Sequence, residues 1–188
     1  MTNPVLDVIF SRRSHRGYSQ EQITDEQLNI LLDAAQAAPS ARNTQPWHIT
    51  VVQNQALLAR MNAAAREGII ASVPEKVRDR YASNDYSVFH HAPTVLFYSC
   101  PALEDMRYAQ TDCGISIENV VLAAESIGLG TVVLGLPREA FVSPEGDAFR
   151  KELQFPEGYD FILAVSVGIP TDDKEAHPIK PGRISYVL

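Results

Sequence analysis

The sequence predicts a single domain of the α+β class, and three observations support this prediction. The chain has 188 residues, which is enough for one substantial hydrophobic core and short for two, so we expect one domain over residues 1–188. Several segments place apolar residues at the i, i+3, i+4, i+7 spacing of a helix that buries one face. Other segments are short runs of β-branched and aromatic residues, which are typical of interior strands.

Helix signals begin at the N-terminus and recur along the chain. Asn3 can cap a first helix with Pro4 in its first turn, and Thr24 with Gln27 forms a capping box for a second. A long, broadly apolar helix is expected to end at Gly128, because glycine commonly follows a helix C-terminus. The expected helices lie at about 4–11, 24–38, 57–68, 75–81, 111–127 and 143–153, with Thr111 and Asp112 capping the fifth.

Apolar runs at residues 47–52, 94–100, 131–134 and 161–167 are expected to be strands. The last segment, residues 177–188, contains two prolines and a glycine but ends in an apolar run. Such a run would be a liability in water, so we expect it to dock on a sheet edge of this chain or of a partner. Residues 69–86 carry weak signals, and we expect variable, mobile structure there that could act as a lid.

Composition excludes several functions. The hydrophobic share of 45% and the charged share of 21% are those of an ordinary globular domain. The formal net charge of -7 argues against a nucleic-acid partner, so any bound anion should be small and locally recognised. No apolar run approaches the roughly 20 residues of a membrane span. The two cysteines, Cys100 and Cys113, do not indicate a disulfide framework, and we expect a cytoplasmic location.

The usual motifs of several reaction classes are missing. There is no GxSxG elbow, no GxxxxGK[ST] loop and no CxxC pair, which argues against nucleophilic hydrolysis, P-loop phosphate transfer and thiol redox chemistry. The adjacent His90 and His91 suggest a metal site at first sight. We expect none, because no second ligand cluster is present and neighbours on a strand point to opposite faces.

Two polar stretches remain as candidates for function. Residues 39–48 carry two prolines between a helix and a strand, which holds the backbone open for contacts outside the loop. The alternative is a loop that satisfies its own polar groups. Residues 12–16 bring three arginines and a serine together, which suits a phosphate clamp, although a solvated basic surface is the common alternative. Together with the glycine-flanked strand and the basic tail, these stretches suit an aromatic cofactor that carries a phosphate.

The chain contains, in order, Arg12-Arg13-Ser14-His15-Arg16, then Pro39-Ser40-x-x-Asn43-x-Gln45-Pro46-Trp47-His48, and then Gly128-Leu129-Gly130-Thr131 after a long helix. This pattern resembles the FMN-dependent nitroreductase family over essentially the whole chain. The resemblance implies a three-layer α+β fold in which helices flank a mostly antiparallel central sheet. It also implies a homodimer with FMN at the subunit interface and a C-terminal arm that extends onto the partner subunit.

The resemblance also implies roles for individual residues. Arg12, Ser14 and Arg16 would hold the phosphate and the ribityl and pyrimidine side of FMN, with Arg13 close by. The other subunit would supply Pro39, Ser40, Ala41, Asn43 and Gln45. Leu134 and Gly135 would bring backbone N–H groups to the flavin N5 edge, and Lys180 and Arg183 would complete the phosphate site. Residues 84–89 lack the lysine that many relatives place near the pyrimidine ring, and Asn84 is the candidate replacement.

The family activity is an FMN-dependent transfer of reducing equivalents from NAD(P)H, through flavin N5, to nitroaromatic, quinone or similar acceptors by a ping-pong mechanism. FMN carries the chemistry, so no catalytic side chain is predicted. Three alternatives stay open: a specialised flavin enzyme on the same scaffold (reductive dehalogenation, dehydrogenation or flavin fragmentation), a non-catalytic flavin-binding protein, and a helical dimer whose arginines bind acidic partners.

Overall fold

A four-stranded antiparallel sheet forms the centre of the protein. The computed structural model describes residues 3–101 and 106–187. Its strands run in the order β1-β2-β4-β3, and every neighbouring pair is antiparallel. The bounds are β1 His48–Val52, β2 Thr94–Pro101, β3 Gly130–Leu134 and β4 Tyr159–Gly168. All four expected strands are present, and β3 lies at one edge of the sheet.

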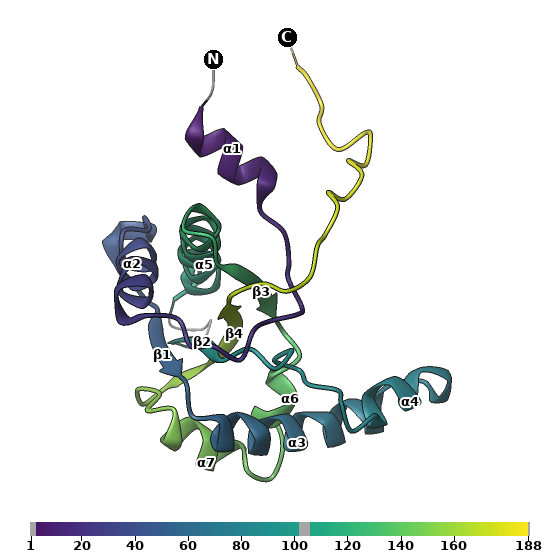
Figure 1. The fold of residues 1–188 in the computed structure, drawn as a ribbon. Helices are drawn as coiled ribbons and strands as arrows, with labels where there is room; N and C mark the ends of the chain where they lie inside the picture. Colours follow the sequence, from purple (N-terminus) through teal and green to yellow (C-terminus); the bar gives the residue numbers. More distant parts are fainter. Residues whose placement is uncertain (1–2, 102–105, 188) are drawn as a thin grey trace.

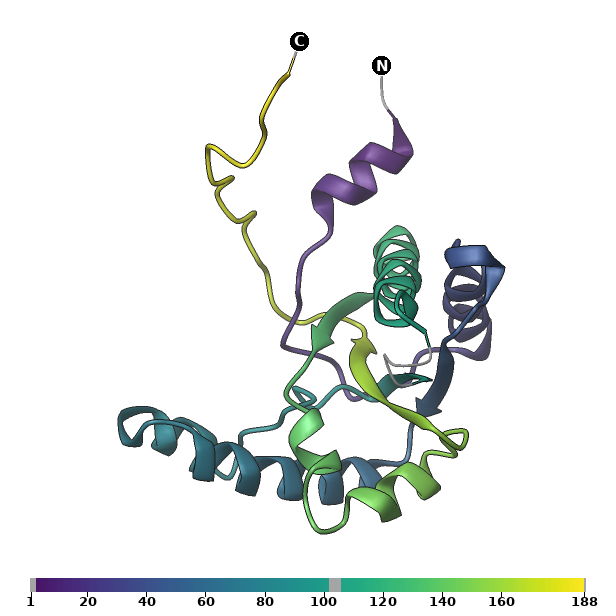
Figure 2. The ribbon, with the colours of Figure 1, turned by 180° about the vertical axis from the view of Figure 1, so that it is seen from behind.

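Helices cover both faces of this sheet, which gives three layers (Figures 1 and 2). The long helices α2 and α5 pack side by side on one face, and α3, α6 and α7 lie on the other. The bounds are α1 Pro4–Ser11, α2 Asp25–Gln36, a 3-10 turn Ala41–Asn43, α3 Gln55–Ser72, α4 Glu75–Ala82, α5 Ala109–Ser126, α6 Arg138–Phe141 and α7 Gly146–Glu152. The α+β class and the flanked antiparallel sheet are therefore confirmed.

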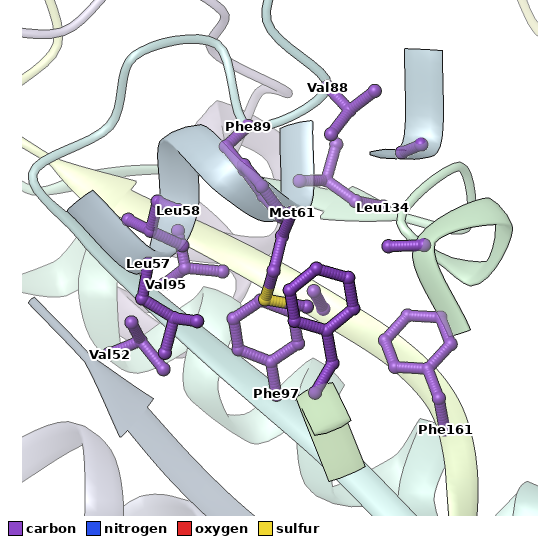
Figure 3. Close-up of a cluster of buried hydrophobic side chains, with 14 of the residues drawn as sticks. Val52, Leu57, Leu58, Met61, Val88, Phe89, Val95, Phe97, Leu134 and Phe161 are labelled. Atoms are coloured by element: carbon purple, nitrogen blue, oxygen red, sulfur yellow. The ribbon is translucent and has the colours of Figure 1, made fainter. Parts of the chain in front are cut away.

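Two hydrophobic cores, one on each face of the sheet, hold the layers together. Strand β2 contributes to both, because successive side chains point to opposite faces. Phe97 joins the core beneath α3, where Met61 lies against it (Figure 3). Tyr98 joins the core beneath α2 and α5. Cys100 and Cys113 lie in this second core, both buried and neither in a disulfide.

The helix ends largely follow the capping signals. Asn3 Oδ1 accepts a hydrogen bond from the N–H of Val5 at 3.1 Å, and the Thr24 capping box is present. Gly128 takes a φ of 78°, and the N–H of Leu129 donates to the carbonyl of Ala124 at 2.9 Å, as expected where glycine ends a helix.

Three local predictions were wrong. Helix α5 begins at Ala109, so Asp112 lies inside its first turn and does not cap it. Helix α3 continues past residue 68 because Ile69, only 2% exposed, packs into the core. His90 and His91 lie in a turn before β2 and not on a strand, and both have a φ of 55°.

Helix α1 and the C-terminal segment extend away from the layered body on the same side (Figures 1 and 2). The apolar stripe of α1 is largely exposed, with Phe10 at 69%. Ile184 and Val187 of the tail are 74% and 99% exposed. The tail therefore does not dock on the sheet of its own chain over the residues described, and Leu188 lies outside them. Docking on a partner stays a prediction.

No helix within residues 3–101 and 106–187 combines the length and the apolar character that a membrane span requires.

Residues 69–86 form the end of α3 and then α4, which projects from the body (Figure 1). Their expected mobility stays a prediction.

Candidate functional site

Residues 12–18, here called the basic connector, join α1 to the body of the protein along the outer edge of β3. Ser14 forms a parallel bridge with Thr131, and the N–H of His15 donates to the carbonyl of Thr131 at 2.9 Å. The predicted phosphate-binding arginines are thereby fixed beside the edge strand of the sheet.

The three arginines of the connector have different surroundings. Arg16 is exposed, and its Nη1 lies 3.3 Å from the carbonyl oxygen of Ser14. Arg12 is half-buried at the end of α1. Arg13 donates from Nη1 to the carbonyls of Phe10 and Arg12 at 2.6 and 2.8 Å, so its guanidinium holds the end of α1. Arg12 and Arg16 are the cations better placed for an external anion.

Beyond the connector, the edge of β3 is open. The carbonyl of Thr131 points toward the connector, and backbone groups alternate along a strand, so those of Val133 face the same edge. Gly135 follows the last residue of β3, and its carbonyl accepts from the N–H of Arg138 at 3.1 Å, which leaves its N–H as the backbone group without a partner among the described residues. The N–H of Leu134 then turns toward β4. At the rise of an extended chain, Gly135 lies about 13 Å from Thr131, just past the end of β3. A Cβ atom at Gly135 would meet nothing within 4 Å, so this backbone is accessible to a flat ligand.

The second predicted stretch, residues 39–46, is here called the polar loop. Its backbone is less free than expected. Ser40 Oγ accepts from the N–H of Gln45 at 2.9 Å, and Gln45 Nε2 donates to Asn43 Oδ1 at 2.9 Å. A 3-10 turn forms at Ala41–Asn43, where the sequence predicted no helical structure. Left-handed φ angles of 45° to 55° at Arg42, Asn43 and Gln45 show that the loop holds a strained conformation.

Asp112 anchors this loop to α5, a role that sequence reasoning missed. The N–H of Ala41 donates to both carboxylate oxygens at 3.2 Å, and Asp112 is only 4% exposed. The loop and the start of α5 border a cavity of about 530 Å3, lined by Ala41, Arg42, Thr44, Met106, Arg107, Tyr108, Ala109 and Asp112.

Within one chain, the polar loop and the basic connector belong to different surfaces. None of the described residues that line the cavity comes from the connector or from β3. Lys180 and Arg183 lie on the exposed tail and form no hydrogen bond or ion pair with the described residues. The predicted ligand residues therefore form three separate groups in a single copy of the chain, over the residues that the structure describes.

Asp172 was also missed by sequence reasoning, although it holds the basic connector from the side opposite β3. Asp172 Oδ1 lies 2.9 Å from Nδ1 of His15, and Oδ2 accepts from the N–H of Arg16 at 3.0 Å. Partial burial raises the pKa of Asp172, but the hydrogen bonds from Arg16 and His15 outweigh it and lower the pKa to about 2.

Residues 9–169 match the model of the Nitroreductase family. This chain belongs to the nitroreductase family. A nitroreductase with bound FMN from Desulfitobacterium hafniense superposes with a TM-score of 0.92, at 32% identity and full coverage of both chains. A relative from Archaeoglobus fulgidus with the provisional name NADH dehydrogenase/NAD(P)H nitroreductase is 34% identical over 90% of this chain and 87% of its own. The FMN reductase (NAD(P)H) of Bacillus subtilis is 30% identical over 95% of this chain and 71% of its own.

The pKa of Asp172 leads to a prediction about acid stability in this nitroreductase-family chain. Its folded pKa lies below the unfolded value of 3.8, so its contribution to stability is complete above that value and is lost as pH falls toward 2. The unfolding free energy of the wild type minus that of Asp172→Asn should shrink between about pH 4 and pH 2. Urea titrations at several pH values measure this difference, and a constant difference would contradict the expectation.

The anchoring role of Asp112 leads to a second prediction. Asp112→Ala leaves the N–H of Ala41 without its acceptor, which should lower the unfolding free energy by about 1–3 kcal/mol. Asp112→Asn keeps an acceptor oxygen and should lose less. Chemical unfolding of the two variants measures both effects, and an alanine variant as stable as the wild type would show that the contact contributes nothing.

Proposed function

We propose that this chain is an FMN-dependent oxidoreductase that passes reducing equivalents from NADH or NADPH to nitroaromatic, quinone or similar acceptors by a ping-pong mechanism. The observation that carries the proposal is the edge of β3. Cations of the basic connector lie beside its first residues, and open backbone follows about 13 Å away. FMN has the matching form, with a phosphate at one end and a flat hydrogen-bonding ring at the other.

The residues present fit this group. Arg12 and Arg16 would bind the phosphate, since guanidinium groups pair bidentately with phosphate oxygens, and Ser14 would donate its hydroxyl. The N–H of Gly135 would reach the N5 edge of the ring. Of the predicted pair, Gly135 is favoured over Leu134 because the N–H of Leu134 faces β4. When bound, FMN would supply the hydride acceptance and electron transfer that no side chain provides.

The proposed functional unit is a homodimer that holds FMN between its subunits. Two surfaces support this. Helix α1 and the tail expose apolar side chains on the same side of the body, including Phe10 at 69% and Tyr186 at 80%. The predicted flavin residues of one chain also lie on separate surfaces. In the dimer, the polar loop of one copy would contact the FMN held by the connector of the other, and Lys180 and Arg183 on the tail would approach the phosphate.

The proposal is tested with purified protein reconstituted with FMN. It should show a bound-flavin absorption spectrum and should oxidise NADH or NADPH faster when a nitroaromatic or quinone acceptor is present. Parallel double-reciprocal plots at several acceptor concentrations are expected for a ping-pong mechanism. Flavin binding without nicotinamide oxidation would instead support a flavin-binding protein, and absence of flavin binding would contradict the proposal.

A further inference from the structure

We propose that Asp172 is a positioning residue. Through its contacts with His15 and Arg16, it would hold the basic connector in the position needed to bind a phosphate. This inference rests on the proposed FMN function and adds a residue pair outside the set that the family resemblance implied. Asp172 would not touch the ligand itself. It would act on the cations that do.

The contacts fix the connector on both sides. Arg16 carries a predicted phosphate-binding guanidinium, and its own N–H donates to Asp172 Oδ2 at 3.0 Å. On the opposite side, the N–H of His15 is bound to the carbonyl of Thr131. Further along, the N–H of Thr171 donates to the carbonyl of Gly17 at 3.0 Å. The connector is thus held between β3 and the segment that follows β4.

The imidazole of His15 has a defined orientation in this arrangement. Its Nδ1 lies 2.9 Å from Asp172 Oδ1 and 3.0 Å from the backbone carbonyl oxygen of the same residue. Both partners can only accept, so Nδ1 must carry the proton. The side chains are mostly shielded, at 14% exposure for His15 and 23% for Asp172. A shielded bond to a charged acceptor is worth more than an exposed surface pair.

Close packing leaves the connector little freedom to move. A Cβ atom added at Gly130 would lie 3.0 Å from Cγ of His15 and 2.8 Å from Cβ of Pro170. A Cβ atom added at Gly17 would lie 2.9 Å from Oγ1 of Thr171. All three distances are shorter than ordinary van der Waals contact, so a side chain at either glycine would force a neighbouring atom to move. A shift at residue 172 would therefore be transmitted to the arginines.

A positioning role and a purely electrostatic role of Asp172 predict opposite changes in FMN affinity when its charge is removed. The groups that face it are the imidazole of His15, the backbone N–H of Arg16, and the charged Lys174, whose Nζ lies 3.6 Å from Oδ2. By charge alone, a carboxylate near the connector opposes an anionic ligand, so its removal would tighten FMN binding. A positioning role predicts the opposite, which is weaker binding.

The experiment compares FMN with riboflavin, which has the same ring and ribityl chain but no phosphate, in flavin-fluorescence titrations of the apoprotein. Asp172→Ala should raise the Kd for FMN about tenfold and leave that for riboflavin within about twofold. The matched control is Asp173→Ala, which removes the same charge one residue away from an exposed side chain. It should leave both constants near the wild-type values.

A second pair of variants tests the His15 contact. His15→Leu should weaken FMN binding about fivefold, whereas His15→Asn, whose amide nitrogen can replace Nδ1 as the donor, should restore it to within about twofold of the wild type.

If Asp172→Ala leaves the ratio of FMN affinity to riboflavin affinity unchanged or raises it, the inference is overturned and the proposed function stays intact. Equal loss of both ligands would also overturn it, because it indicates a general structural role. Failure of the wild type to bind FMN would contradict both proposals.

Discussion

Deletion of residues 176–188 is expected to make the protein monomeric and to abolish tight FMN binding. The deleted arm carries Ile179, Ile184, Tyr186 and Val187, which are 74% to 99% exposed in the single chain. Burial of a large apolar side chain contributes about 1.5–3 kcal/mol, so four of them would supply much of the free energy of a stable dimer. Sedimentation analysis and flavin titration measure the two effects.

A matched variant separates the two roles of the arm. Lys180→Ala with Arg183→Ala removes the cations and keeps the apolar side chains. This variant should remain dimeric but bind FMN at least tenfold more weakly. A truncated chain that still forms dimers would show that the arm does not hold the subunits together.

Replacement of Arg12 and Arg16 together by alanine is expected to weaken FMN binding by at least a hundredfold while the protein stays folded and dimeric. Hydrogen bonds from a guanidinium to phosphate are charge-assisted, and loss of one costs about 1.5–3 kcal/mol. Fold and dimer should survive because Arg16 is exposed and the end of α1 is held by Arg13.

The matched control for the arginine pair is Lys76→Ala with Lys151→Ala, which removes two exposed positive charges from α4 and α7. It should leave the FMN affinity nearly unchanged. Comparable weakening in both double variants would mean that net charge, and not the connector, governs binding.

The features that could be predicted from the sequence are those that neighbouring residues determine. The capping box at Thr24, the glycine at position 128 and the β-branched run of β2 each depend on residues a few positions apart, so the elements were identified correctly. Strand order could not be derived in this way, because it depends on packing between distant segments. The antiparallel sheet was predicted from the family resemblance alone.

For the candidate site, the sequence indicated the cations but not the residues that hold them in place. The connector arginines stand out as a local cluster in an acidic chain. Asp172 and His15 are 157 residues apart, and Asp112 and Ala41 are 71 apart, so no local pattern relates them. The left-handed φ angles at Arg42, Asn43 and Gln45 could not be predicted either, because none of these residues is glycine.

The central claim is that two copies of the chain build each flavin site, and mixed dimers test it most directly. One parent is the Arg12→Ala/Arg16→Ala variant, and the other is Asn43→Ala/Gln45→Ala in the polar loop. Each homodimer should lack tight FMN binding. After unfolding and refolding of an equal mixture, half of the dimers should be mixed, and each should contain one intact site, so about a quarter of all sites should bind FMN tightly. Recovery of that fraction is the predicted result, and no recovery, from a mixture shown to contain mixed dimers, would contradict the shared site.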